Sequence, residues 1–472
     1  MRKTLSVLLL LSLIFTNTLV LRAAETKKKE STKSEEDTKN WPQAPKIEAP
    51  SAILMDASSG LILYEKNANK KRYPASVTKI MTTLLAIENS AMNETVVFSR
   101  NAIHSIEPGS NHIAMKEDEE LTMEQCLYAV MLASANEVSN AVGEHVAGDS
   151  KSFTEMMTNR AKELGCKNTN FENANGLYNE NHYTTAYDLA LISREALKHD
   201  MFRKVTSQRV YTIPKTNLTK ESRVFSNHHQ MLMGTTKPQY KYDGCIGGKT
   251  GYTVKSKHSL ATFASKDGMD LICIVMNNPS SNSQYESTTK LLDYGFDNFS
   301  VYDVSVEDDY NLVDSSIYFT RYNSFFDRSK SPLQIAGTST VILPNTAEFN
   351  EVEKDIEYTS LEKLEVGSNV LGTVLYKYGD KVVGSSDITY NYKITPMSYN
   401  LDKPKMIEVA TVTEKPSFDL KPIIIGAIIV ILIILYLTYY FLVEKPRQMR
   451  RRSFYNKRKY RSKLDFDRNL FK

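Results

Sequence analysis

Three short motifs contain the residues of this chain that are best suited to nucleophilic chemistry: Ser76-Val77-Thr78-Lys79, Ser134-Ala135-Asn136 and Lys249-Thr250-Gly251. A serine hydroxyl is a weak nucleophile unless a base lies beside it. Residues three apart share one face of a helix, so the Lys79 amine can reach the Ser76 hydroxyl. An amine acts as a base near neutral pH only when burial or a nearby cation lowers its pKa. The first motif therefore predicts a serine nucleophile with a lysine base.

The other two motifs supply what such a pair still needs. The Ser134 hydroxyl can relay a proton between Lys79 and a leaving amine, and the Asn136 amide can hold a substrate backbone. Lys249 offers a charge, and it would also depress the pKa of Lys79 if both lie in one pocket. In the same motif Thr250 offers a hydrogen bond, and Gly251 lets a substrate backbone approach closely. The backbone N–H groups of Ser76 and Tyr252 are candidates for an oxyanion hole, where one donor contributes about 3 kcal/mol.

Each motif has a simpler interpretation when it is taken alone. Ser76 can be a helix N-cap, Ser134 and Asn136 a polar interruption of a helix, and Lys249 a solvated charge on a strand. The order of the three motifs favours the catalytic interpretation, because they fall at a helix start, in a helical segment and on a strand.

A nucleotide site is the competing interpretation of Gly248-Lys249-Thr250, which resembles the end of a phosphate-binding loop. That loop needs a glycine six residues before its lysine. Asp243 stands there, and Gly244 comes one residue late. The loop must also lead into a helix, whereas Tyr252-Thr253-Val254 continues a β-prone run. We therefore expect no bound nucleotide.

Residues 49–299 have the pattern of one α/β (α+β) domain. Residues 51–67 read as two strands around a turn at 58–60, and Pro74 suits entry into a helix that places Ser76 in or beside its first turn. Further helices are expected at 122–147, 152–165 and 185–199, and strands at 209–214, from Lys249 onward and at 271–277 after an Asp267-Gly268 turn. This order predicts a sheet that joins both ends of the domain.

Residues 300–400 lose the helical pattern and read as a small all-β domain. Short β-rich runs occur at 315–320, 339–344, 355–361 and 370–394, the last with a turn at 378–380. Two prolines and several charges make residues 401–421 a stalk. The chain contains no internal repeat.

The two ends of the chain indicate export and anchoring. Residues 1–24 have the layout of a signal peptide, although a plain N-terminal anchor is an alternative. The polar run 25–48 reads as a disordered tether. Residues 422–443 carry no charge, and a helix over 423–443 would extend about 31 Å, enough to cross a bilayer. The alternative is a buried soluble helix. The tail 444–472 holds 12 Lys and Arg against three Asp and Glu, which predicts a cytoplasmic tail and an extracytoplasmic catalytic domain.

Charge and metal-binding residue types narrow the possible partners. The net charge is +4, of which the tail contributes +9 and residues 1–24 contribute +3, so residues 25–443 carry −8. An acidic exported body gives no support for nucleic-acid binding. The eight histidines form no zinc pattern, so we expect no metal. The chain has four cysteines, Cys126, Cys166, Cys245 and Cys273, which are too scattered for a disulfide framework. Their spacing does not decide whether any pair forms.

The stretch from about Ala49 to the LDYGFDNF segment resembles the serine D-alanyl-D-alanine carboxypeptidases, which are low-molecular-mass penicillin-binding proteins. The resemblance rests on YEKNANKKRYPASVTKIMT, MLASANEVSNAVGEHVAG, RAKELGCKNTNFENANGL, NENHYTTAYDLALISREAL and GGKTGYT. It implies the penicillin-binding-protein/β-lactamase-like transpeptidase fold. It also implies removal of the terminal D-alanine from peptidoglycan pentapeptides through an acyl-enzyme, in cell-wall biosynthesis and remodelling.

The resemblance assigns roles residue by residue. Ser76 is the acylated nucleophile, Lys79 the proton acceptor, Ser134 the relay and Lys249 the contact for the substrate carboxylate. β-Lactams are the implied inhibitors, and the implied reaction uses no cofactor or metal.

This sequence departs from the family pattern in three places. Residues 173–178 read Asn-Ala-Asn-Gly-Leu-Tyr where many members have Asn-Pro-His-Gly-Leu-Asp, which puts the contacts of that loop in doubt. Ser256-Lys257-His258 follows the third motif where an Ala-Gly pair is common. Asn227-His228-His229 stands where some members place an arginine near the substrate carboxylate. If His228 replaces that arginine, substrate binding should weaken as the pH rises past the imidazole pKa.

Two other functions remain alternatives. A β-lactamase would need a carboxylate that activates water, and no Glu-x-x-Leu-Asn stretch lies around 173–183. A catalytically silent wall-binding scaffold would retain the fold without needing Ser76, Lys79 or Lys249. Labelling with penicillin separates these alternatives from a carboxypeptidase.

Overall fold

The computed structural model describes residues 41–304, 333–335, 340–359 and 365–392. The expected signal peptide, the tether up to residue 40, the stalk, the membrane-spanning segment, the basic tail and the strand at 315–320 all lie outside these residues. Within the described part of the chain, no helix has the length and apolar character needed to cross a membrane.

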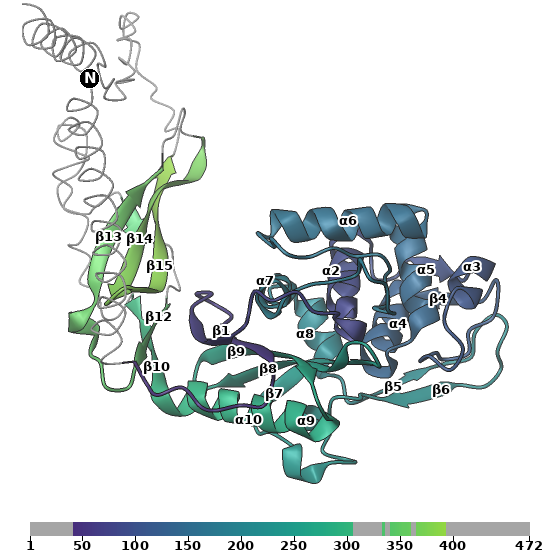
Figure 1. Ribbon diagram of the computed structural model, residues 1–472. Helices are drawn as coiled ribbons and strands as arrows, with labels where there is room; N and C mark the ends of the chain where they lie inside the picture. The colour runs from purple at the N-terminus through teal and green to yellow at the C-terminus, as the bar shows by residue number, and fades with distance from the viewer. Residues whose placement is uncertain (1–40, 305–332, 336–339, 360–364, 393–472) are drawn as a thin grey trace, which may run out of the picture. The chain divides into compact units, whose positions relative to one another are not determined.

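A five-stranded antiparallel sheet forms the centre of the first part of the chain (Figure 1). Its order is β2-β1-β9-β8-β7, and its strands are β1 (Ser51–Asp56), β2 (Ile62–Lys66), β7 (Cys245–Thr253), β8 (Lys257–Lys266) and β9 (Met269–Asn278). Strand β1 pairs with β9 from Ser51 opposite Met276 to Asp56 opposite Leu271. The sheet therefore joins both ends of the domain, as the sequence predicted.

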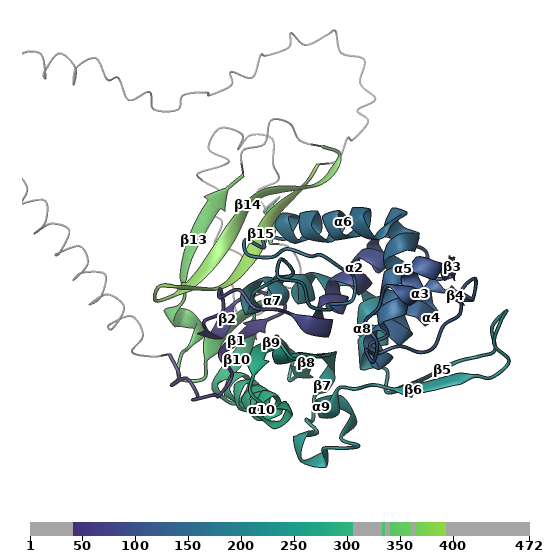
Figure 2. The same ribbon diagram turned by 45° about the vertical axis from the view of Figure 1, so that its right-hand side comes forward.

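The two faces of the sheet pack against different layers because successive strand residues point to opposite sides. Ile53 and Met55 of β1 belong to the core shared with the main helical layer. Ala52 and Leu54, which alternate with these two residues along β1, belong to the core on the other face. Helix α10 (Ser281–Asn298) packs on that second face, against β8 and β9 (Figure 2).

The helical layer contains most of the remaining helices of this part. These are α2 (Lys79–Asn89), α3 (Arg100–His104), α4 (Met123–Tyr128), α5 (Asn136–Ala147), α6 (Ser150–Glu163), α7 (Ala186–Ala196) and α8 (Asp200–Ser207). Helices α7 and α8 contact the sheet directly, at β9 and β7. The short helix α9 (Gln230–Met233) and the 3₁₀ turn η3 (Pro238–Tyr240) precede β7.

The helix expected over 122–147 is wrong as one continuous element. A π-helical turn, η2 (Ala129–Ala133), follows α4, and the chain then breaks before α5 begins at Asn136. Ser134 adopts the left-handed conformation, with φ 59° and ψ 33°, so it cannot continue a right-handed helix. π-helical turns inside α-helical segments often accompany functional sites, and this one positions the second motif.

Two small two-stranded sheets flank this layer, and strands dominate the described residues after Asn298. These sheets pair β3 (Thr95–Val97) with β4 (Glu120–Thr122), and β5 (Val210–Ile213) with β6 (Arg223–Ser226). Beyond α10, β10 (Phe299–Asp303) pairs with β12 (Thr340–Pro344). A second sheet has the order β11-β15-β14-β13 and contains β11 (Leu333–Ile335), β13 (Glu353–Tyr358), β14 (Gly367–Tyr378) and β15 (Lys381–Tyr392), with the 3₁₀ turn η5 (Phe349–Glu351) before it.

Candidate active site

The expected nucleophile lies on a tight turn immediately before helix α2. Ser76 belongs to the 3₁₀ turn η1 (Ala75–Thr78), and the helix continues from Lys79. Ala75 has φ 53°, a left-handed conformation that is unfavourable for a residue with a β-carbon. Such strain at a single residue commonly marks a functional position. The Lys79 amine lies 3.4 Å from the Ser76 hydroxyl, as the three-residue spacing predicted.

Lys79 is fully buried and held from three sides. Besides Ser76, its amine donates hydrogen bonds to the Asn136 amide oxygen at 2.7 Å and to the backbone carbonyl of Asn175 at 2.6 Å. Burial lowers the pKa of Lys79 well below its ordinary value, and the nearby charge of Lys249 lowers it further. A neutral amine that faces a serine hydroxyl can accept its proton.

Ser134 lies opposite this pair, at the break that follows η2. Its hydroxyl accepts a hydrogen bond of 3.0 Å from the Lys249 amine, which also donates to the Thr250 carbonyl at 3.0 Å. Burial lowers the pKa of Lys249 to about 7. The left-handed backbone of Ser134 therefore places its hydroxyl between the second lysine and the cleft, where a proton relay is chemically possible.

Strand β7 passes directly beside the nucleophile's turn. A β-carbon added to Gly251 would lie 3.0 Å from the Pro74 carbonyl oxygen and 3.1 Å from the Ser76 nitrogen. Only glycine gives this close approach without displacing the turn. The backbones of Ser76 and Tyr252 therefore lie at the same point of the cleft, which is the arrangement that an oxyanion hole requires.

A cavity of about 380 Å³ opens above these residues. It is lined by Ser76, Gly109, Ser110, Asn111, Ser134, Asn136, Gly176, Leu177, His228, Thr250, Gly251, Tyr252, Thr253, His258, Ser281, Gln284 and Tyr285. Six of the eight predicted site residues line it, and the other two, Lys79 and Lys249, reach Ser76 and Ser134 at its floor. The structure thus brings all eight together from segments that lie up to 176 positions apart in the sequence.

The loop that departs from the family pattern still contacts the site, through its backbone. Asn175 offers its carbonyl to Lys79, and its side chain donates 2.9 Å to the Asn140 amide oxygen. A β-carbon on Gly176 would lie 1.9 Å from the Ala75 carbonyl oxygen, so this loop is seated on the nucleophile's turn. Because the contact to Lys79 is a main-chain one, it does not depend on the missing histidine and carboxylate. Sequence reasoning missed Asn175, since no side-chain pattern marks a carbonyl ligand.

Glu137 is a second residue that sequence reasoning missed. It follows Asn136, is almost fully buried, and accepts a 2.7 Å hydrogen bond from the backbone N–H of Ile113. Asn136 in turn donates its own N–H to the Asn111 carbonyl at 2.9 Å. Asn136 and Glu137 therefore hold the loop at residues 111–113, of which Asn111 lines the cleft. In the sequence, the acidic residue directly after Ser134-Ala135-Asn136 was the feature that could have identified Glu137.

His228 and His182, two of the histidines near the site, are neutral at pH 7. Burial and the charge of Lys249 lower the pKa of His228 to about 4, although His228 does line the cleft. The sequence suggested that His228 replaces the arginine of some family members as a cation near the substrate carboxylate. This expectation is revised, because a neutral imidazole contributes a hydrogen bond and no charge. Burial and Lys79 lower the pKa of His182 to about 3, and its ring contacts Thr78 of the nucleophile's turn at 2.9 Å.

The cysteines and the acidic clusters of the described residues give no further chemistry. All four thiols are free, three of them buried, which resolves the question that spacing left open. Glu88, Glu195 and His199 bring three ligand atoms together. Arg160 already pairs with Glu88 at 2.7 Å and with Glu195 at 3.5 Å, so this cluster is an ion-pair network.

Residues 38–280 match the protein-family model described as D-alanyl-D-alanine carboxypeptidase. The D-alanyl-D-alanine carboxypeptidase DacF of Bacillus subtilis is 34% identical over 262 residues, which are 54% of this chain and 64% of that relative. DacA of Haemophilus influenzae is 27% identical over 365 residues, 75% of this chain and 87% of the relative.

Two solved structures extend the comparison to the fold. Penicillin-binding protein 6B from Escherichia coli is 25% identical, with a TM-score of 0.55, and the match covers 74% of this chain and 96% of that one. The Streptomyces K15 DD-transpeptidase is 28% identical with a TM-score of 0.50, over 54% of this chain and 100% of that one. The α/β transpeptidase fold of penicillin-binding proteins is therefore present here. With a serine, two buried lysines and a second serine in one cleft, and a family model that matches more than half of its length, this chain belongs to the D-alanyl-D-alanine carboxypeptidase family of serine hydrolases.

Proposed function

We propose that this protein removes the terminal D-alanine from peptidoglycan pentapeptides and that β-lactams inhibit it by acylating Ser76. The observation that carries the proposal is the 3.4 Å contact of the buried Lys79 amine with the Ser76 hydroxyl, close to Lys249. Family membership identifies the reaction class, and the cleft supplies the groups that the reaction needs.

Acylation begins with the Ser76 hydroxyl oxygen attacking the carbonyl of the penultimate D-alanine. The hydroxyl proton passes to neutral Lys79 as the new C–O bond forms. The N–H groups of Ser76 and Tyr252 stabilise the negative oxygen of the tetrahedral intermediate. The terminal carboxylate of the peptide pairs with Lys249 and accepts a hydrogen bond from Thr250, which orients the scissile bond over the serine.

Collapse of the intermediate breaks the C–N bond, and D-alanine leaves when its nitrogen gains a proton. Ser134 lies at the point where this proton can pass, since its hydroxyl contacts Lys249 and faces the cavity. A water molecule then attacks the ester at Ser76, Lys79 accepts the proton of that water, and the shortened peptide departs with the serine restored. A β-lactam follows the first step, but its leaving nitrogen stays tethered to the acyl group.

The ends of the chain support a location for this activity. We propose that residues 1–24 direct export and that residues 422–443 anchor the protein, with the catalytic domain outside the cytoplasmic membrane and the basic tail 444–472 inside. The support is the uncharged run and the excess of Lys and Arg after it. Protease accessibility of an epitope on each side of 422–443, in intact cells and in lysed cells, tests this arrangement.

One experiment tests the enzymatic proposal. The ectodomain, beginning at residue 41, is incubated with labelled penicillin and separately with a peptide that ends in D-Ala-D-Ala, beside Ser76→Ala. We expect long-lived label on Ser76, release of one D-alanine per peptide, and neither event in the variant. Rapid turnover of penicillin would indicate a β-lactamase. A folded protein that is neither labelled nor active would be a silent scaffold.

A further inference from the structure

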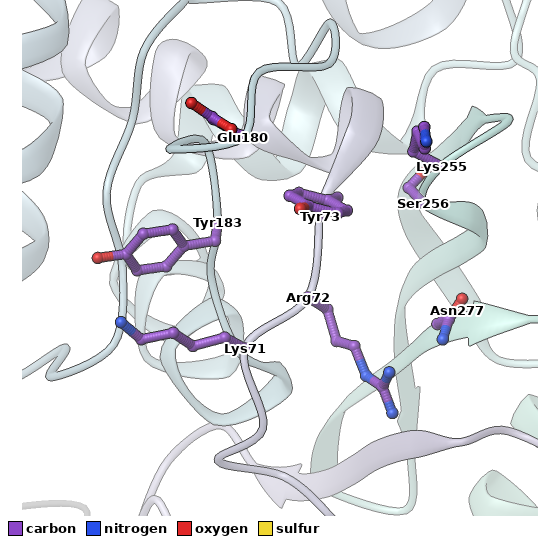
Figure 3. A pocket seen from close by; sticks show the side chains of 8 residues that line it. All are labelled: Lys71, Arg72, Tyr73, Glu180, Tyr183, Lys255, Ser256 and Asn277. Atoms are coloured by element: carbon purple, nitrogen blue, oxygen red, sulfur yellow. The ribbon is translucent and has the colours of Figure 1, made fainter.

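A second cavity, of about 340 Å³, lies beside the turn that precedes the nucleophile (Figure 3). Figure 3 shows Lys71 and Tyr183 on one side, Lys255, Ser256 and Asn277 on the other, Tyr73 and Arg72 between them, and Glu180 above. We call this cavity the basic pocket. Three cationic side chains and one carboxylate line it, so it has a surplus of positive charge.

The cations of the basic pocket have no carboxylate partner among the described residues. No ion pair joins Lys71, Arg72 or Lys255 to an acid there, and Glu180 pairs with none of them. Lys71 lies 4.0 Å from the centre of the Tyr183 ring and is stabilised by it. Arg72 donates only its Nε hydrogen, to the Ser51 hydroxyl at 3.0 Å, and burial lowers its pKa. A partly desolvated guanidinium without an acid is a ready partner for an anion.

The walls of the pocket are held in place before any ligand binds. The main chain of Arg72 exchanges hydrogen bonds of 2.7 and 2.9 Å with Thr184. Ser256 is buried, and its hydroxyl accepts a 2.9 Å hydrogen bond from the Thr253 N–H. Asn277 has φ 61° within strand β9, which is a strained conformation for a residue in a strand. A preorganised site loses less entropy when it binds its ligand.

The basic pocket adjoins the catalytic cleft at Thr253 and Ser256. Thr253 lines the cleft and Ser256, its hydrogen-bond partner, lines the pocket, while Tyr73 precedes Ser76 by three residues. A peptide whose terminal carboxylate lies at Lys249 and whose scissile carbonyl lies at Ser76 runs along β7 toward Thr253. The residues ahead of the scissile bond therefore leave the cleft toward the basic pocket.

From this geometry we infer that the basic pocket binds a carboxylate on the acyl-donor side of the peptide substrate, with Arg72 and Lys255, at opposite ends of the pocket, as its sources of positive charge. The inference rests on the proposed function, because the direction of the peptide follows from placing its terminal carboxylate at Lys249. Lys71 adds to the potential of the pocket while its amine stays over Tyr183. The pocket then selects donor peptides by charge, and the first site selects their D-Ala-D-Ala end.

A pair of peptides separates the two selections. One is L-Ala-γ-D-Glu-Nε-acetyl-L-Lys-D-Ala-D-Ala, with the glutamate carboxylate free, and the other is the same peptide with that carboxylate converted to the amide. Values of kcat/KM for D-alanine release are measured for both with the wild type, Arg72→Gln, Lys255→Gln and the control Lys70→Gln. Lys70 is exposed and adjacent to Lys71 but does not line the pocket. The rate of acylation by penicillin is measured for each protein.

We expect the wild type and Lys70→Gln to prefer the free carboxylate by up to about fivefold, and Arg72→Gln and Lys255→Gln each to lose part of that preference, because an ion pair with an exposed or half-buried cation contributes at most about 1 kcal/mol. Penicillin acylation should be equal in all four. Lys255→Gln changes only an exposed turn residue, so it reports on the pocket even if Arg72→Gln weakens the fold. Equal rates for both peptides in the wild type would overturn the inference and leave the proposed function standing. Failure to release D-alanine from either peptide would overturn the proposed function itself.

Discussion

The Lys249 amine donates a 3.0 Å hydrogen bond to the Ser134 hydroxyl, although the two residues lie 115 positions apart in the chain. This contact joins strand β7 to the break between η2 and α5. It buries a second lysine near Lys79, whose own amine contacts Asn136, two residues after Ser134. Each buried cation makes the charged form of the other less favourable. The site therefore controls the protonation of its base through a neighbour that also binds substrate.

The first prediction concerns the pH dependence of acylation. The pKa of Lys79 is lowered by burial and by Lys249, and the neutral amine is the active form, so the rate should rise as the pH passes that pKa. Removing the second cation in Lys249→Gln raises the pKa of Lys79, so the rising limb of kcat/KM should move to higher pH. The pKa of Lys249 is about 7, so binding of the substrate carboxylate in the wild type should weaken above that pH. Stopped-flow acylation and D-alanine release from pH 5 to 10 measure both limbs.

Lys249→Arg is the matched control for this prediction. It retains a positive charge at the same place, so its rising limb should stay near that of the wild type while the falling limb disappears, because a guanidinium does not lose its proton in this range. A rising limb that stays in place in Lys249→Gln would contradict the electrostatic coupling.

Several strands and helices were predictable because each has a strong local pattern, whereas the sequence reasoning missed the helices α8 (Asp200–Ser207) and α10 (Ser281–Asn298). The hairpin around Gly60 and the turn at Asp267-Gly268 carry residues with positive φ, and these residue types are readable in the sequence. The order of elements predicted a sheet that joins both ends of the domain, and the pairing of β1 with β9 does so. The π-helical turn before Ser134 was not predictable, because Ala129–Ala133 is a run that an ordinary α-helix accommodates equally well.

The side chains of the site were predictable, but the main-chain contact of Asn175 with Lys79 was not. Serine, lysine and asparagine at fixed spacings indicate a serine nucleophile with a base, and in the structure these residues lie in one cleft. The carbonyl of Asn175 is common to every amino acid, so its contact with Lys79 leaves no trace in the sequence. The protonation of His228 was also missed, because burial beside Lys249 depends on packing that no local pattern encodes.

The second prediction is that His228 acts without a charge. Its pKa is lowered to about 4, so the imidazole is neutral across pH 5.5 to 7.5. His228→Gln keeps a hydrogen-bond donor of similar reach, and the KM for a D-Ala-D-Ala peptide should show the same pH profile in variant and wild type over that range. A KM that rises near pH 6.5 in the wild type alone would restore the cationic role.

The third prediction concerns a buried ion pair that holds the β5–β6 hairpin to the loop before β4. Glu119 is fully buried and accepts hydrogen bonds of 2.9 Å from both terminal nitrogens of Arg223. Burial raises the pKa of Glu119, but the hydrogen bonds from Arg223 and Thr216 outweigh it and lower the pKa to about 2. Because the folded pKa lies below the unfolded one, this stabilisation is present above about pH 4.5 and is lost as the pH falls through about 2.

Arg223→Gln should therefore lower the free energy of unfolding by about 3–5 kcal/mol at pH 7, since it leaves a buried carboxylate without its cation. Urea denaturation of the ectodomain measures the change. Lys151→Gln is the control, because the pair of Lys151 with Glu155 is 86% and 65% exposed and should contribute less than about 0.5 kcal/mol. Equal losses in the two variants would show that Glu119 gains little from Arg223.

The fourth prediction separates a steric contact at the site from backbone strain alone. Gly176 and Gly148 have nearly the same positive φ, 88° and 85°. A β-carbon at Gly148 meets no atom within 4 Å, whereas one at Gly176 lies 1.9 Å from the Ala75 carbonyl oxygen and 2.9 Å from the Thr78 hydroxyl. Gly148→Ala should cost about 1 kcal/mol of stability and leave penicillin acylation unchanged.

Gly176→Ala must also push the loop away from the nucleophile's turn, which withdraws the Asn175 carbonyl from Lys79. We expect its acylation rate to fall at least tenfold, a loss that corresponds to about 1.4 kcal/mol in the barrier. If the two alanine variants acylate at the same rate, the loop does not position Lys79.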